Sequence, residues 1–268
     1  MILAVRYHHE RTHPLFAEAN AKLLNADRVL TFTGQPFFDT FGAMLETLVE
    51  QDDDRFLTVD ADMLVTDSET VRRYLTPEYD YVDFHVVDKF RGIQQGGPHC
   101  YSKRMLHAMA EARRDIAHEQ EFIKRPEGYT KGVALYRSGF KPHVERRAVA
   151  HHDYAQYRRD VFYKYLYRGW RTSPEDAHAW FAQWAHEHDA DFQVARTAME
   201  WGWQHPLADF PRGITKDQVS ALFDSLAFTE KSSPIEHAEL PPAIQRSLEQ
   251  AAKLDRYRPG NDYQDRLR

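Results

Sequence analysis

Two carboxylates follow a strongly apolar stretch of the chain. Residues 56–59 read Phe-Leu-Thr-Val, and Asp60 and Asp62 come directly after them. Such a run predicts a buried strand. In an open α/β sheet, ligands bind at the carboxyl ends of the strands, and carboxylate oxygens there can hold a hard divalent cation. That cation can bridge a diphosphate, so Asp60 and Asp62 are candidate ligands for a metal ion and a ribose hydroxyl.

A second Asp-x-Asp sequence in the chain serves as a comparison. Asp189 and Asp191 follow His186-Glu187-His188 in a region with a helical pattern. We interpret this copy as a solvated helix end. The position after a strand, and not the bare motif, therefore distinguishes the first copy.

Alternating strands and helices must position the first pair of carboxylates. β-Branched and aromatic runs predict strands over residues 2–7, 28–33, 55–59, 81–87 and 99–102, and helical spacing predicts helices over 14–25, 37–51 and 103–117. This alternation favours an α/β fold with a mostly parallel central sheet flanked by helices.

From about residue 172 the strand patterns end. Ser173 and Thr215 are helix-cap residues, the latter in a capping box with Gln218, and a last helix is predicted over 241–254. All five tryptophans lie between residues 170 and 203. We interpret them as a packing cluster, with a stacking platform for a sugar or a base as the alternative.

Composition narrows the class of protein. The 268 residues carry a net charge of −6, with 42% hydrophobic and 28% charged residues, which is typical of a globular chain. The single cysteine, Cys100, excludes a disulfide framework and a multi-cysteine zinc site. No apolar run approaches the roughly 18 residues of a membrane span, and the N-terminal run is too short for a signal peptide. We therefore expect a cytoplasmic protein.

The order of several short motifs resembles the GT-A fold of nucleotide-sugar glycosyltransferases, particularly the family 2 type. In that family a "DADD" segment follows the strand that ends the nucleotide-binding half, as Asp60-Ala61-Asp62 does here. Residues 96–106 are similar to the acceptor-side segment. Residues 126–141 have the spacing of "ED…L..R…GF", and residues 148–152 resemble the strand that ends in histidine.

The resemblance covers residues 1–171 and implies a GT-A (Rossmann-like) domain there. Its donor half would span about residues 1–65 and its acceptor half about 66–171, with a helical C-terminal extension over 172–268. It implies a metal-dependent enzyme that moves a sugar from a nucleoside-diphosphate sugar, preferably UDP-linked, to an acceptor hydroxyl. The acceptor is left open between a glycan, a protein, a small molecule and a hydroxylated DNA base.

The same resemblance assigns candidate metal ligands. Asp60 and Asp62 would bind Mn²⁺ or Mg²⁺ together with a histidine from the pair His151 and His152. We favour His151 because Val-x-His matches the end of the family's strand. An imidazole ligand favours Mn²⁺ over Mg²⁺.

The general base is the point of departure from the family. Its Glu-Asp pair supplies the base at the aspartate, and Gly128 stands at that position here. Glu127 is the candidate base, with Glu119 and Glu121 nearby in sequence as alternatives. Inversion and retention at the sugar both stay open.

Residues at the end of the first strand, Arg6, Tyr7 and His8, are expected to line the pocket for the nucleotide base and ribose. The stretch 158–171 interleaves basic and aromatic residues. An amphipathic helix is the first interpretation. The second adds a contact from Lys164, Arg168 or Arg171 to the diphosphate. A nucleic-acid patch is the least favoured.

Two other functions stay open. One is a nucleotidyltransferase on a similar sheet, which would release pyrophosphate from a nucleoside triphosphate. The other is a catalytically silent module that binds a nucleotide or a glycan. The sequence lacks the Gly-x-Gly-x-x-Gly, Walker, His-Glu-x-x-His and Gly-x-Ser-x-Gly motifs. Their absence argues against a nicotinamide oxidoreductase, a P-loop NTPase, a zincin and a serine hydrolase.

Overall fold

The computed structural model describes residues 1–7, 13–34, 37–210, 213–235 and 240–254. Its contacts divide the chain into two compact units, one formed by residues 1–154 with 236–268 and the other by residues 155–235. The boundary expected at residue 171 falls inside the second unit of this division. The last helix, over residues 242–252, belongs to the first unit.

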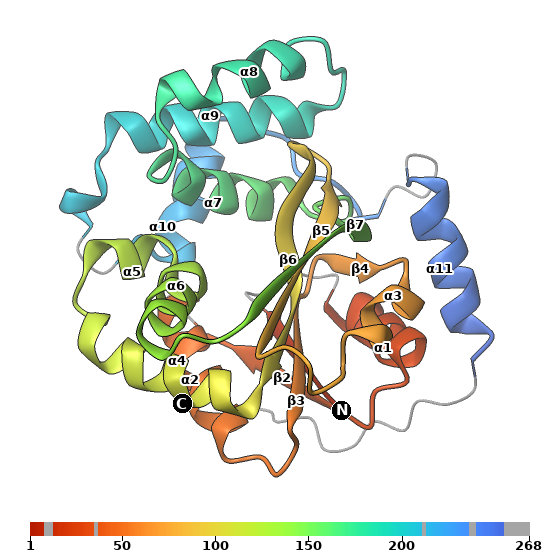
Figure 1. The fold of residues 1–268 in the computed structure, drawn as a ribbon. Coiled ribbons are helices and arrows are strands. Elements are labelled where there is room, and N and C mark those ends of the chain that lie inside the picture. Colours follow the sequence, from red (N-terminus) through yellow and green to blue (C-terminus); the bar gives the residue numbers. More distant parts are fainter. Residues whose placement is uncertain (8–12, 35–36, 211–212, 236–239, 255–268) are drawn as a thin grey trace. The chain divides into compact units, whose positions relative to one another are not determined.

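The first unit contains a sheet of seven strands among the described residues, in the order β2-β1-β3-β6-β5-β7-β4 (Figure 1). The strands are β1 (Ile2–Tyr7), β2 (Arg28–Thr33), β3 (Arg55–Asp60), β4 (Met63–Val65), β5 (Tyr81–Asp88), β6 (Gly92–Ser102) and β7 (Pro142–His152). Pairings β1–β2, β1–β3 and β5–β7 are parallel, and β3–β6, β5–β6 and β4–β7 are antiparallel. The α/β class is therefore confirmed, and the sheet is mixed.

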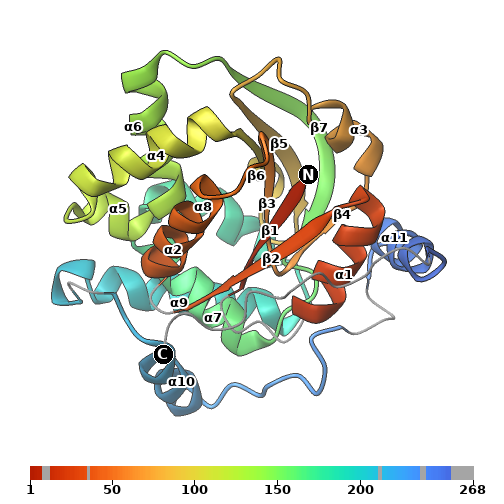
Figure 2. The same cartoon turned by 90° about the horizontal axis from the view of Figure 1, so that it is seen from below.

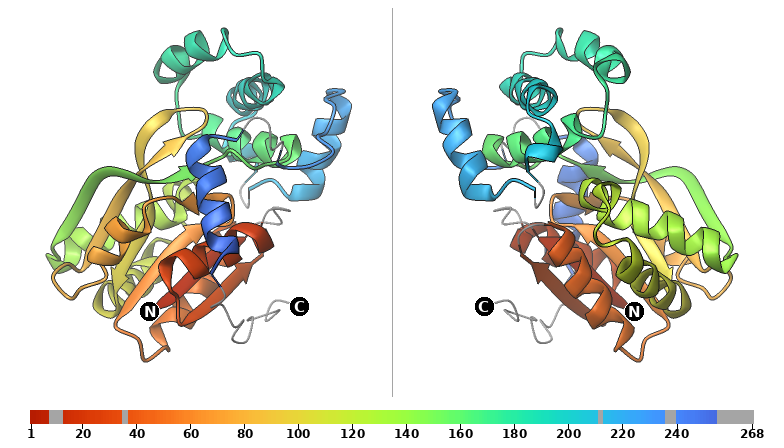
Figure 3. Two further views of the ribbon diagram at one scale, coloured as in Figure 1. Left: turned by 90° about the vertical axis from the view of Figure 1, so that its right-hand side faces the viewer. Right: turned by 90° about the vertical axis from the view of Figure 1, so that its left-hand side faces the viewer.

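Helices cover both faces of this sheet (Figure 2). One face carries α2 (Phe37–Val49), α4 (Lys103–Ile116), α5 (Gln120–Lys124) and α6 (Pro126–Ser138); the other carries α1 (His13–Leu24), α3 (Ser68–Arg73) and α11 (Pro242–Ala252). Helix α11 lies beside α1 (Figure 3). Successive strand residues point to opposite faces, so Ile2 and Ala4 join one apolar cluster whereas Leu3 and Val5 join the other.

Several elements extend beyond the sequence prediction, β6 and α6 among them. The strand expected over 99–102 is the end of β6, whose first half is polar and exposed and therefore lacks an apolar signature. Helix α6 was not predicted, although Pro126 begins it and Gly139 ends it in a left-handed conformation with φ of 62°. Proline at a helix start and glycine just after its end are ordinary helix signals.

The second unit is helical. It contains α7 (Arg158–Gly169), α8 (Pro174–Trp184), α9 (Ala190–Gln204) and α10 (Lys216–Ser225). Ser173 and Thr215 cap α8 and α10 as predicted. Helices α7 and α9 approach closely at Gly169 and Gly202, where a Cβ would lie 2.6 and 2.8 Å from backbone carbonyl oxygens of the opposite helix.

Tryptophan side chains of the second unit take part in packing. The indole nitrogens of Trp170 and Trp203 donate to backbone carbonyls of His205 and Thr172, at 2.8 and 2.7 Å, and Trp184 is buried. These contacts support the packing interpretation of the tryptophans.

The expectation that Asp191 lies at a solvated helix end is wrong. The residue is 1% exposed and forms ion pairs with Arg158 and Lys231. Within the described part of the chain, no helix has the length and apolarity needed to cross a bilayer.

Burial of Cys100 in β6 predicts that the single thiol of the sequence is unreactive. Cys100 is fully buried, and burial raises the pKa of its thiol to about 12. At pH 8 only about one molecule in ten thousand would carry a thiolate, the reactive form. We expect Ellman's reagent to label the native chain negligibly over an hour and to label one thiol in 6 M guanidinium. Full labelling of the native chain within minutes would contradict this placement.

Candidate functional site

Strand pairing brings the end of β7 to the end of β3. Strand β3 ends at Asp60, two residues turn, and β4 begins at Met63. Antiparallel pairing of β4 with β7 sets Met63 opposite His152, and parallel pairing of β5 with β7 sets Asp88 opposite His152. Asp62 therefore reaches His152 although 90 residues separate them in sequence.

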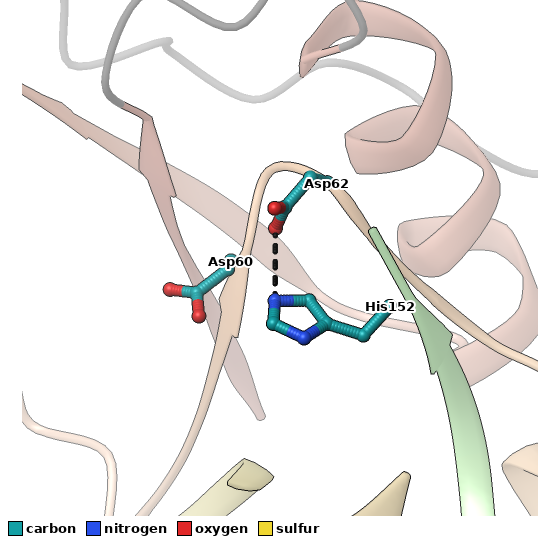
Figure 4. Close-up of side chains that lie close together, drawn as sticks. All are labelled: Asp60, Asp62 and His152. Carbon is teal, nitrogen blue, oxygen red and sulfur yellow. Dashed lines mark ion pairs between the residues drawn. The ribbon is translucent and has the colours of Figure 1, made fainter. Parts of the chain in front are cut away.

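Asp60, Asp62 and His152 converge, with candidate ligand atoms that all lie within 4.8 Å of one another (Figure 4). Asp62 is 2% exposed and His152 is 5% exposed. His152 Nε2 lies 3.4 Å from Asp62 Oδ1, and its Nδ1 lies 3.1 Å from Asp88 Oδ2. In a neutral imidazole one nitrogen donates a hydrogen and the other offers a lone pair that can bind a metal ion. Two carboxylates and an imidazole thus form a donor set that fits a divalent ion.

His151, which the sequence analysis favoured, lies elsewhere. It is paired with Leu64, one position along the β4–β7 ladder. Consecutive strand residues point to opposite faces, so the two histidines diverge. His151 Nδ1 lies 3.2 Å from Thr66 Oγ1, and burial lowers the pKa of its imidazole. The structure groups His152 with the two aspartates, which differs from the preference for His151 drawn from the sequence.

Asp88 is a site residue that the sequence analysis missed. Its Oδ1 accepts from the backbone N–H groups of Phe90 and Arg91, both at 3.0 Å. Its Oδ2 accepts from the Arg91 and Gln94 side chains at 2.7 and 2.8 Å. Burial opposes ionisation, but the hydrogen bond with His152 and the charge of Arg91 hold the pKa of Asp88 well below its usual range. An aspartate four residues before Gly92 carries only a turn signal in the sequence.

Arg6 connects Asp60 to Glu127. The guanidinium is buried, lies 2.7 Å from Asp60 Oδ1 and forms an ion pair with Glu127. Glu127 also accepts from the Tyr101 hydroxyl at 2.7 Å. The structure shows Arg6 as a buried bridge between two carboxylates, and its predicted contact with a nucleotide stays a prediction.

Glu127 is poorly suited to act as a base in this arrangement. Burial favours its neutral form, but the charges of Arg6, His99 and Lys131 outweigh burial and lower the pKa of Glu127 to about 2. A carboxylate with so low a pKa takes up a proton weakly near neutral pH. The geometry favours a structural role for Glu127, in which it holds Arg6 against Asp60.

The network of charged side chains continues on the face of the sheet that helix α6 covers. His99 Nδ1 lies 3.0 Å from Asp83 Oδ1, and Asp83 Oδ2 accepts from Gln95 at 2.6 Å and from Lys131 at 3.3 Å. Buried charges are tolerated when they are paired and hydrogen-bonded. Asp60 therefore stands at the exposed end of a buried chain of charges.

Further residues are predicted to contact the nucleotide. Tyr7 ends β1 and is half-buried, and His8 lies outside the described residues. Lys164 and Arg168 lie on α7 in the second unit. Their predicted contacts with a nucleotide stay predictions.

Asn20 of α1 fixes the short strand that follows Asp62. It is fully buried, donates to the carbonyl of Met63 and accepts from the N–H of Val65, both at 2.8 Å. Its amide thus completes the hydrogen bonding of β4 on the side opposite β7. The position of Asp62 depends on this contact because β4 begins at the next residue.

Comparison with protein-family models and with curated proteins finds no match. Among solved structures, the chain is similar to a glycosyltransferase involved in the glycosylation of the major capsid of PBCV-1, with 12% identity and a TM-score of 0.39 over 56% of this chain and 92% of that one. It is also similar to 2-C-methyl-D-erythritol 4-phosphate cytidylyltransferase from Thermus thermophilus, with 11% identity and a TM-score of 0.41 over 75% and 100%.

A third similar structure is the glycosyltransferase GlyE of Streptococcus pneumoniae, with 9% identity and a TM-score of 0.36 over 86% of this chain and 65% of that one. Sugar transfer and nucleotidyl transfer therefore both occur among the similar structures. At these identities and TM-scores the function has to be argued from the residues of the site.

Replacing Asn20 tests the support of β4. Asn20→Ala leaves a buried N–H and a buried carbonyl without partners, and we expect the free energy of unfolding to fall by about 3 kcal/mol. Gln51→Ala is the matched control, because it removes one half-buried bond from a side chain to a backbone carbonyl and should cost under about 1 kcal/mol. Urea unfolding of both variants measures the difference. Equal losses would contradict the proposed support of β4.

Glu127 predicts a pH-dependent contribution to stability. A lowered folded-state pKa gives stability that is fully present above the unfolded value, near 4.5, and is lost as the pH falls toward 2. Glu127→Gln should therefore destabilise the chain at pH 7 by about 3 kcal/mol, and the difference should vanish near pH 2. Denaturant titrations across this range test it. A constant difference at every pH would show that the charge of Glu127 is not what stabilises the fold.

Proposed function

We propose that the chain is a metal-dependent transferase that uses a nucleotide-sugar donor, and that it transfers the sugar to an acceptor hydroxyl on a GT-A-like fold. The observation that supports this is the convergence of Asp60, Asp62 and His152 at the carboxyl end of β3. Ligands of open α/β sheets bind at this edge. The resemblance of the short motifs to nucleotide-sugar glycosyltransferases adds to this support.

Each site residue has a distinct task in this proposal. Asp62 and His152 hold the ion, with Mn²⁺ preferred over Mg²⁺ because of the imidazole. A divalent ion bound there would neutralise the diphosphate leaving group. Asp60 is about one-third exposed and is oriented by its ion pair with Arg6, which suits a carboxylate that contacts the ion and a ribose hydroxyl.

Nucleotidyl transfer is the second candidate because of Glu127. The family that the sequence resembles places its general base next to this position, yet Gly128 lacks a side chain, and Glu127 is buried against Arg6. A nucleotidyltransferase needs the same ion for a triphosphate but does not need that base. The two reactions differ in the group released, which is a nucleoside diphosphate in one and pyrophosphate in the other.

Nucleotide binding should depend on a divalent ion and on Asp62. We expect one of UDP, GDP, CDP and TDP to raise the melting temperature of the chain with Mn²⁺ but not with EDTA. At a hundred times its dissociation constant the ligand stabilises by about 2.7 kcal/mol, or several degrees. Asp62→Ala should abolish the shift, and Asp67→Ala, which removes a cap of α3, should keep it. No shift with any nucleotide would contradict the proposal.

Product analysis then separates the two reactions. The chain is incubated with Mn²⁺ and either a nucleoside-diphosphate sugar or a nucleoside triphosphate plus a sugar 1-phosphate. Slow release of free sugar and nucleoside diphosphate from the first mixture, absent in Asp62→Ala, is the expected result. Pyrophosphate release from the second mixture alone would reject glycosyl transfer in favour of nucleotidyl transfer.

A further inference from the structure

The tip of the β5–β6 hairpin is bonded to His152 twice. Strand β5 ends at Asp88 and β6 begins at Gly92. The backbone N–H of Lys89 donates to the carbonyl of His152 at 3.1 Å. The carboxylate of Asp88 meets the imidazole Nδ1 of the same residue at 3.1 Å. The hairpin therefore fixes both the backbone and the ring of this histidine.

The surroundings of Asp88 determine which imidazole nitrogen carries the proton. Asp88 accepts four N–H groups, two from the backbone of its own turn and two from Arg91 and Gln94. A carboxylate surrounded by donors in this way is an acceptor only. The fifth contact, to His152 Nδ1, is therefore donated by the imidazole. The lone pair of the neutral ring is then on Nε2, which faces Asp62 at 3.4 Å.

We propose that Asp88 is the positioning residue of the metal centre, and that it fixes the tautomer and the ring orientation in which His152 offers Nε2 to the ion. The part of this proposal that concerns the ion rests on the proposed function. Metal-binding histidines generally donate their other ring N–H to a carboxylate or carbonyl, which orients the ring and increases its basicity as a ligand. The β5–β6 hairpin, which contributes no residue to the Asp60, Asp62 and His152 cluster, thereby becomes part of the site.

Asp88→Asn separates positioning from a general structural role. Asparagine keeps an oxygen for the backbone N–H groups of the turn. It replaces the oxygen that faces His152 by an NH₂ donor, which favours the tautomer with hydrogen on Nε2 and so withdraws the lone pair from the ion. Asp67→Asn is the matched control: Asp67 also accepts from a backbone N–H and from side chains, in this case Thr70 and Arg147. Gln94→Ala is a second control that removes one donor to Asp88 and leaves His152 in contact.

The experiment measures Mn²⁺ affinity and the imidazole tautomer in the full chain. Calorimetric titration with MnCl₂ alone should give a dissociation constant 10- to 100-fold weaker for Asp88→Asn and within about threefold of the native value for both controls. Long-range ¹H–¹⁵N spectra of the metal-free protein should show His152 with hydrogen on Nδ1 in the native chain and on Nε2 in Asp88→Asn. Melting temperatures of all variants show that the fold persists.

Mn²⁺ affinity and the imidazole tautomer together distinguish a failure of the positioning role from a failure of the proposed metal centre. Native affinity for Mn²⁺ in Asp88→Asn, or an Nε2–H tautomer in the native chain, would overturn the positioning role. Absence of Mn²⁺ binding in the native chain would overturn the proposed metal centre, and the tautomer spectrum would still test the action of Asp88 on His152. If Asp88→Asn fails to fold, the native tautomer alone decides the question.

Discussion

The register between β4 and β7 is the constraint on which the site depends. It sets Met63 opposite His152, so Asp62 and the histidine meet although they come from distant parts of the sequence. A register shift of one residue would place His151 next to Asp62 in place of His152. It would also turn all the other side chains of the strand to the opposite face of the sheet. Asn20 holds β4 from the side of α1, and the Lys89 N–H holds the end of β7. The apolar packing of the sheet thereby places a polar cluster at its edge.

The site also requires that its charges be paired, because most of its ionisable side chains are buried. Arg6 lies between Asp60 and Glu127, and Asp88 is surrounded by donors. Removing one member of such a buried pair leaves an uncompensated charge, which is far costlier than losing an exposed pair. Glu127 therefore stabilises the site by keeping Arg6 in place. The same charged neighbours, Arg6 first among them, lower the pKa of Glu127 and make it a weak base.

The sequence predicts the parts of this site that depend on local pattern. The run before Asp60 predicts β3 and the position of both aspartates at its end, because buried strands have a strong apolar signature. It does not predict which histidine joins them, since that follows from a strand register set by residues far apart in the chain. Asp88 was missed for the same reason, and its turn is polar. Arg6 was expected at a substrate from its place at the end of the first strand, and Glu127 from the family resemblance. Only the fold shows them paired with each other.

On this proposal His152 and Asp62 bind the same divalent ion. Crystals grown with MnCl₂ and the nucleoside diphosphate that stabilises the chain, measured near the manganese absorption edge, test this most directly. We expect one strong anomalous peak within bonding distance of His152 Nε2 and an Asp62 carboxylate oxygen, with Asp88 still bonded to Nδ1. A peak coordinated by His151, or no peak at this edge of the sheet while nucleotide is bound, would contradict it.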